Sequence, residues 1–137
     1  MTSVPTLLDT DILSAIMRRE PLAVARARSY LLARSRFTIS IITRYEILCG
    51  LKAKKASTQL AKFEIFCASI EVLPITDATI VRAADIYANL LERGGLIGDA
   101  DILIAATALE HGLVLSTNNE KQHRRIAALQ IDNWLKA

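Results

Sequence analysis

Near the start of the chain, a short apolar run leads directly into two carboxylates. The run ends at Leu7-Leu8, Asp9 and Asp11 follow two residues apart, and Ile12-Leu13 begin an amphipathic segment. This pattern predicts a β-strand over residues 4–8 whose carboxyl end delivers acids to a strand-to-helix turn. Because ligand sites of open parallel α/β sheets form at that edge of the sheet, we expect further polar side chains beside Asp9.

Predicted strands and helices alternate along the whole chain. The expected strands cover residues 4–8, 37–40, 71–75, 113–116 and 129–131. The expected helices cover a segment ending at residue 20 and residues 22–33, 41–55, 57–69, 77–93 and 99–110, and a short basic helix follows Asn119. This alternation predicts an α/β fold with a mainly parallel sheet of four to five strands and helices on both faces.

Local signals mark the ends of several elements. Short oxygen side chains satisfy the free amides at a helix start, so Thr10 or Asp11 is expected to cap the first helix and Ser40 the third. Pro21 disfavours a helical residue before it, which ends the first helix. Trp134 is expected to fix the end of the chain to the core.

Length and composition restrict the class of protein. A chain of 137 residues, 52% of them hydrophobic, is expected to form one domain over residues 1–137 with one core. No apolar stretch approaches the roughly 20 residues of a bilayer span, and the first residues lack the pattern of a signal peptide. Cys49 and Cys67 are expected to be free thiols in a reducing compartment. We therefore expect a cytoplasmic protein without membrane association.

The distribution of acidic residues is more informative than the net charge. Five of the 14 acids are candidates for one pocket, namely Asp9, Asp11, Glu46, Asp99 and Asp101. If they gather there, the remaining surface carries 17 bases against nine acids. A basic exterior around an acidic pocket suits an enzyme that holds a polyanion and binds a metal inside.

Polar side chains at comparable places on four segments are candidates for that pocket. Asp101 lies at the start of the helix before the fourth strand and Asn119 follows that strand, so both can meet Asp9 if the first and fourth strands are neighbours. Glu46 lies among apolar or small neighbours, where a carboxylate is costly unless it has a role. Each of these residues also has a purely structural interpretation, as a turn, cap or surface group.

Clustered carboxylates restrict the chemistry of such a pocket. They repel and raise one another's pKa, and a hard divalent cation reverses this effect. Oxygen ligands suit Mg²⁺ and Mn²⁺, and a metal-bound water is an improved nucleophile. His111 and His123 are not spaced like a zinc site, and no Ser–His or Cys–His arrangement or glycine-rich phosphate loop competes.

Four stretches resemble, in order, the motifs of the PIN-domain ribonucleases, specifically the VapC-type toxins. They cover residues 7–13, 39–50, 97–106 and 117–119, and the acids of the first three motifs match Asp9, Glu46 and Asp101. In the third motif the family's acid falls three residues after the glycine, which selects Asp101 over Asp99. Two positions depart from the family pattern, because Asn119 stands where many members carry a fourth aspartate and His123 where a phenylalanine is usual.

The resemblance implies a magnesium-dependent endoribonuclease, with Mn²⁺ as a second suitable ion, that hydrolyses RNA phosphodiesters with a metal-activated water. Asp9 and Asp101 would hold the ion, Glu46 would orient or deprotonate the attacking water, and Asn119 would hydrogen-bond a water or the phosphate. The implied substrate is transfer RNA or ribosomal RNA. The implied partners are a second copy of the chain and a VapB-type antitoxin, for which the apolar face near Leu48, Leu51 and Leu60 is a candidate groove.

Two other functions fit part of the pattern. A haloacid-dehalogenase-like phosphatase would use Asp9 as its nucleophile, but that family has glycine and threonine after its aspartate pair, where Ile12 and Leu13 stand here. A non-catalytic RNA-binding PIN-like module would keep the fold and the basic surface without cleaving RNA.

Overall fold

A single parallel sheet forms the centre of the protein. The computed structural model describes residues 4–137, and the expectation about a signal peptide falls partly on residues outside that range. The strands are β1 (Thr6–Leu8), β2 (Thr38–Ser40), β3 (Glu71–Leu73), β4 (Val114–Ser116) and β5 (Ile131–Asp132). They are ordered β3-β2-β1-β4-β5 and every neighbouring pair is parallel. The prediction of a parallel sheet is confirmed, and β1 and β4 are neighbours.

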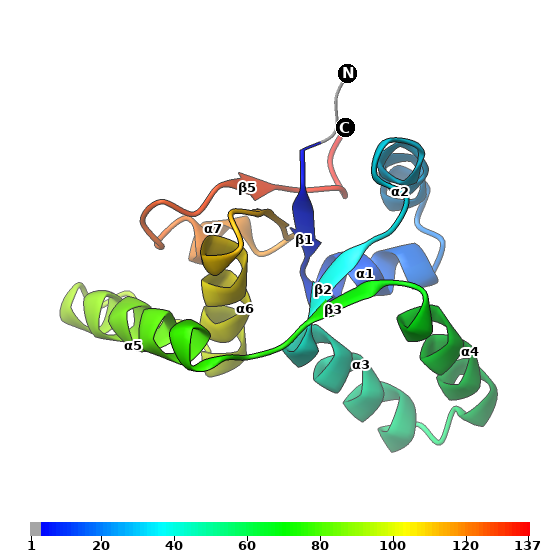
Figure 1. The fold of residues 1–137 in the computed structure, drawn as a ribbon, viewed down its shortest axis with the longest axis horizontal. Coiled ribbons are helices and arrows are strands. Elements are labelled where there is room, and N and C mark those ends of the chain that lie inside the picture. Colours follow the sequence, from blue (N-terminus) through cyan, green and yellow to red (C-terminus); the bar gives the residue numbers. More distant parts are fainter. Residues whose placement is uncertain (1–3) are drawn as a thin grey trace.

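Helices cover both faces of this sheet (Figure 1). They are α1 (Thr10–Met17), α2 (Pro21–Arg34), α3 (Ile41–Ala53), α4 (Ser57–Ala68), α5 (Asp77–Glu92), α6 (Asp99–Glu110) and α7 (Glu120–His123). In Figure 1, α2 and α4 lie on one side of the strands and α5 and α6 on the other. No helix in the described part of the chain is long and apolar enough to cross a membrane.

The core lies on both faces of the sheet because successive side chains of a strand point to opposite faces. Leu8 of β1 packs in a cluster with residues of α1 to α4 and with Trp134. Leu7, its neighbour, packs with Ile104 of α6 on the opposite face. Trp134 is 2% exposed, so the prediction that it fixes the end of the chain is confirmed.

The ends of several elements differ from expectation for local reasons. Helix α1 stops at Met17 rather than residue 20, because Arg19 adopts a left-handed conformation with φ of 60°. Strand β3 stops at Leu73, since Pro74 has no amide hydrogen for the ladder. Ser40 caps α3 as predicted, accepting from the Ile42 amide at 3.0 Å.

The prediction for the first helix cap was wrong. Asp9 itself is the N-cap of α1, and its Oδ1 accepts a hydrogen bond from the Thr10 amide at 2.8 Å. Asp9, Thr10 and Asp11 all carry oxygen side chains suited to a cap, so the sequence alone does not separate them. The consequence is that the carboxylate of Asp9 is held rigidly at the carboxyl end of β1.

Candidate metal centre

Asp9 is the most firmly held side chain of the candidate site. It is 5% exposed, and its amide donates to the Ser116 carbonyl of β4 at 2.9 Å. Its Oδ2 accepts from the Thr117 hydroxyl at 2.7 Å, while Oδ1 is engaged by the Thr10 amide. The turns that follow β1 and β4 therefore position this carboxylate together.

Asp101 meets Asp9 from the start of α6. One ligand atom each of Asp9, Asp101 and His123 lies within 4.8 Å of the others. Asp99, one half-turn earlier on the same helix, is exposed and is not among these three residues. Nor does Asp99 cap the helix, since Gly98 is the N-cap of α6 and makes no side-chain capping bond.

Asp11 lies at the edge of this group. Its Oδ2 accepts from the Asn118 amide at 3.0 Å. Its Oδ1 is buried and has no hydrogen-bond partner among the described residues. Asp11 thus joins the turn after β4 to α1 and leaves one carboxylate oxygen available.

The Glu46 carboxylate is linked to the turn after β1 by the hydroxyl of Thr10. The Thr10 hydroxyl donates to Glu46 Oε1 at 2.6 Å and lies 3.1 Å from the hydroxyl of Thr43. Because Thr10 is the residue after Asp9, this bond holds the Glu46 carboxylate beside the Asp9 turn. Glu46 is not one of the three residues whose ligand atoms converge.

The two asparagines after β4 have different surroundings. Asn119 is half-buried, its side-chain amide donates to the Gln122 side chain, and its backbone carbonyl accepts from the His123 ring. Asn118 is exposed, and its Oδ1 accepts from the Asn133 side chain at 3.1 Å. Asn119 therefore supports His123, while Asn118 is tied to the segment after β5.

His123 is the residue of this site that motif matching missed. It is fully buried, lies four residues after Asn119 on α7, and converges with Asp9 and Asp101. The spacing of the two histidines in the sequence does not fit a zinc site, but the residues that converge with His123 are aspartates on other elements. The available signal was its departure from the family's usual phenylalanine.

Burial and mutual repulsion make the acidic groups reluctant to ionise. Burial, and then the charge of Asp11, raise the pKa of Asp9 above its ordinary value. Burial raises the pKa of Asp11, and burial followed by the charge of Asp9 raises the pKa of Asp101. Asp11 Oδ1 and His123 Nε2 are buried atoms without hydrogen-bond partners among residues 4–137. Together with the three carboxyl groups of raised pKa, they fit a bound divalent cation.

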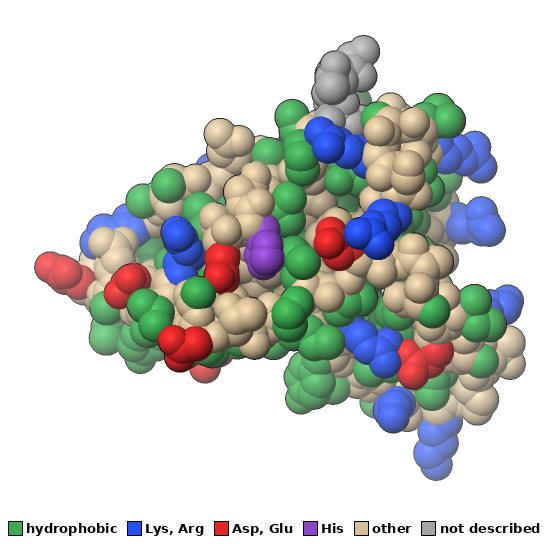
Figure 2. Space-filling view, in the orientation of Figure 1, with side chains coloured by type: hydrophobic (Ala, Val, Ile, Leu, Met, Phe, Trp, Pro, Cys, Tyr) green, Lys and Arg blue, Asp and Glu red, His purple; other side chains and the backbone are tan. Residues whose placement is uncertain are grey.

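A groove opens beside Glu46, between α1, α3 and α4. Its volume is about 620 Å³, and its lining combines apolar side chains with bases, among them Leu51, Phe63, Phe66, Arg18, Arg19, Lys54 and Lys62. On the face shown in Figure 2, basic side chains predominate over the α2 and α4 half of the molecule. The groove thus offers an apolar floor and a positive rim next to the candidate site.

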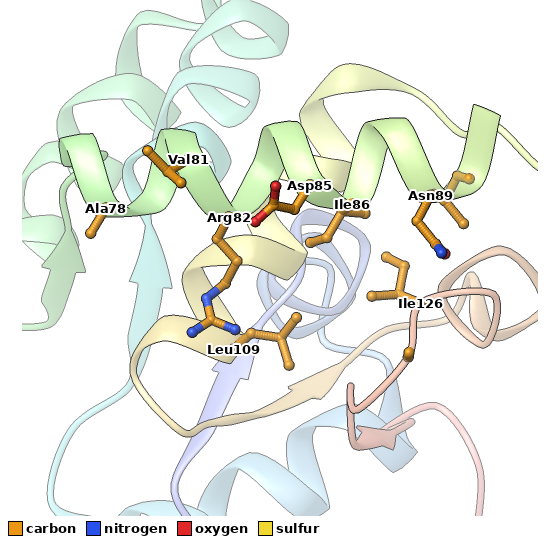
Figure 3. A pocket seen from close by; sticks show the side chains of 10 residues that line it. Ala78, Val81, Arg82, Asp85, Ile86, Asn89, Leu109 and Ile126 are labelled. Atoms are coloured by element: carbon orange, nitrogen blue, oxygen red, sulfur yellow. The ribbon is translucent and has the colours of Figure 1, made fainter. Parts of the chain in front are cut away.

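A second hollow of about 560 Å³ lies along α5. Figure 3 shows Arg82 and Asp85 projecting from that helix near Leu109 and Ile126. None of the converging residues of the metal centre lines it, so it is separate from the candidate site.

The fold and the site together define an α/β protein with a group of converging side chains that could hold a cation at the carboxyl ends of β1 and β4. The family model of the PIN domain matches residues 6–129. The chain therefore belongs to the PIN-domain family, among its VapC-type ribonucleases.

Individual relatives are similar over nearly their whole length. Ribonuclease VapC2 of Haemophilus influenzae is 31% identical over 94% of this chain and 97% of its own. The tRNA(fMet)-specific endonuclease VapC of Salmonella typhimurium is 33% identical over 93% and 96%. The structure of VapBC-1 from nontypeable Haemophilus influenzae superposes with a TM-score of 0.84 and 30% identity, over 96% of this chain and 98% of that one.

Proposed function

We propose that this protein is a metal-dependent endoribonuclease that acts as the toxin of a VapBC-type pair in the cytoplasm. The observation that carries the proposal is the convergence of Asp9 and Asp101, both with raised pKa, at one edge of the sheet. Asp9 and Asp101 would hold a divalent ion, Mg²⁺ or Mn²⁺. When bound, that ion supplies Lewis-acid activation of water and neutralises charge on the phosphate.

Two other side chains would handle the water and the phosphate. Glu46 would orient the attacking water or accept its proton, and the bond from Thr10 would fix the carboxylate for that task. Asn119 has a second amide hydrogen besides the one given to Gln122, and it would donate that hydrogen to the phosphate. In-line hydrolysis would leave a 5′-phosphate and a 3′-hydroxyl.

Transfer RNA is the substrate that we propose. The similarity to relatives named tRNA(fMet)-specific endonucleases, from Shigella flexneri and Salmonella typhimurium, supports this choice over ribosomal RNA. The basic side chains on the face shown in Figure 2 suit the phosphate backbone, which dominates affinity without selecting sequence.

Incubation with RNA and with a small phosphomonoester separates this function from the alternatives. We expect the purified protein with Mg²⁺ or Mn²⁺ to cut transfer RNA and to leave p-nitrophenyl phosphate intact. A phosphatase would give the opposite result and would trap a phosphoryl group on Asp9, an attack that the burial of Asp9 and its two accepted hydrogen bonds disfavour. A binding module would retain RNA and cut neither substrate.

We further propose that the groove beside Glu46 receives a segment of the antitoxin. Leu51 lines this groove, and both Leu48 and Leu51 pack against the core cluster. The apolar floor with its basic rim suits a segment of apolar and acidic residues, and its position next to Glu46 would place that segment beside the site. We also propose that the toxin works as a homodimer, the form that the resemblance implies.

Charge reversal on the rim tests the antitoxin groove. We expect Lys54→Glu with Lys62→Glu to weaken binding of the antitoxin encoded beside this protein by roughly tenfold, since exposed ion pairs are worth up to about 1 kcal/mol each. Lys121→Glu, on α7 and also exposed, is the matched control and should bind normally. Equal binding by all three proteins in a titration at low salt would remove the groove from the interface.

A further inference from the structure

The buried imidazole of His123 has one hydrogen-bonded nitrogen, Nδ1, and one nitrogen without a partner among the described residues, Nε2. The ring is fully buried. Nδ1 lies 2.9 Å from the backbone carbonyl of Asn119, and Nε2 has no hydrogen-bond partner among the described residues. A buried polar atom without a partner costs free energy, so Nε2 requires either a proton shared with the acids or a bound ion.

The hydrogen bond of Nδ1 determines whether Nε2 carries a hydrogen or a free lone pair. A carbonyl oxygen only accepts, so Nδ1 must carry its hydrogen and donate it to Asn119. In the neutral ring this assigns the free lone pair to Nε2. Metal-binding histidines are commonly oriented by such a bond from the other nitrogen to a carbonyl.

A ring nitrogen of His123 and one carboxylate oxygen each of Asp9 and Asp101 lie within 4.8 Å of one another. Because Nδ1 is bonded to the Asn119 carbonyl, Nε2 is the nitrogen free to bind an ion in this group. A lone pair facing two carboxylates is unfavourable unless a proton or a metal cation lies between them, and among the described residues Nε2 makes no hydrogen bond that a shared proton would require. The structure therefore contains a donor set of two oxygens and one nitrogen.

We propose that His123 Nε2 is a direct ligand of the ion at this site, and that the site selects a first-row transition ion such as Mn²⁺ over Mg²⁺. Mg²⁺ favours oxygen ligands and water, whereas imidazole suits transition ions. This inference rests on the proposed metal site and refines the ion that it holds.

Pulsed electron paramagnetic resonance of Mn²⁺ detects the nitrogen directly. We expect EDTA-treated protein loaded with less than one equivalent of Mn²⁺ to show ¹⁴N modulation, and protein labelled with ¹⁵N-histidine to show the ¹⁵N pattern. His111, the other histidine of the sequence, lies exposed at the end of α6, so His111→Phe should keep the signal and His123→Phe should lose it. Absence of nitrogen modulation in the wild-type protein would overturn the proposal without need of any variant.

Calorimetric titration gives a second readout. The ratio of the Mg²⁺ to the Mn²⁺ dissociation constant is expected to fall at least about tenfold in His123→Phe. The ratio should be unchanged in His111→Phe, and circular dichroism checks that both variants are folded. An unchanged ratio in folded His123→Phe would overturn the assignment. If Mn²⁺ binds without nitrogen modulation and RNA is cut, the assignment of His123 as a ligand fails and the proposed function stands. If neither Mg²⁺ nor Mn²⁺ binds, the ligand assignment and the proposed function both fail.

Discussion

Asp101→Asn is expected to lower the rate of transfer RNA cleavage by about 100-fold or more. The substitution keeps the size of the side chain and removes one of the two carboxylates proposed to hold the ion, so charge stabilisation at the phosphate is lost. Initial rates at saturating RNA and fixed Mn²⁺, with circular dichroism to confirm folding, measure the effect.

Asp99→Asn is the matched control for this substitution. Asp99 lies two residues earlier, in the same first turn of α6, but its side chain is exposed and does not converge with Asp9. Both substitutions remove a first-turn acid that the helix dipole favours, so any general effect on α6 is shared. A cleavage rate near wild type is expected for Asp99→Asn. Equal losses of cleavage rate in the two variants would show that the rate depends on negative charge at the start of α6 and not on the approach of Asp101 to Asp9.

Asp9→Asn is expected to lower the cleavage rate as much as Asp101→Asn does. Without metal, it is also expected to stabilise the fold at neutral pH. Burial and Asp11 raise the pKa of Asp9 above 3.8 in the folded state. The stability that this group contributes is therefore fully present below about pH 3.8 and is lost as the pH rises through the higher folded pKa. Asparagine has no charge to bury, so the variant escapes this loss.

Thermal unfolding in EDTA at pH 4 and pH 7.5 measures this effect. The midpoint of Asp9→Asn should exceed that of the wild type at pH 7.5, by roughly 4 °C for each kcal/mol regained, and the difference should shrink at pH 4. Added Mn²⁺ should raise the wild-type midpoint, because an ion that binds only the folded state stabilises it, and should have little effect on the variant. A variant less stable than the wild type at both pH values would contradict this assignment of the Asp9 charge.

The features predictable from the sequence are those set by local pattern. The alternation of predicted strands and helices indicated the parallel sheet with helices on both faces. The same pattern indicated a helix over residues 99–110, where α6 lies. The order of elements also allowed Asp9 and Asp101 to meet, on the condition that the first and fourth strands are neighbours, which they are. Local spacing alone did not separate Asp101 from Asp99, and the motif resemblance was needed for that choice.

The features that the sequence did not predict depend on contacts between distant residues. The bond from Thr117 to Asp9 joins residues 108 positions apart, and it exists because β1 and β4 pair in a particular register. The approach of His123 to the two aspartates follows from the same pairing and from the turn into α7. The link from Thr10 to Glu46 depends on how α3 lies against α1, which no spacing within either helix specifies.

The central claim is that the ion held by Asp9 and Asp101 is required for RNA cleavage. The most direct measurement is the rate of transfer RNA cleavage by EDTA-treated protein as free Mn²⁺ is raised, with the wild type and Asp101→Asn in parallel. The proposed site predicts no cleavage in EDTA, a saturable rise for the wild type, and a response in Asp101→Asn that is at least about 100-fold lower at the same Mn²⁺. Cleavage by the wild type in excess EDTA, or superimposable curves for the two proteins, would contradict it.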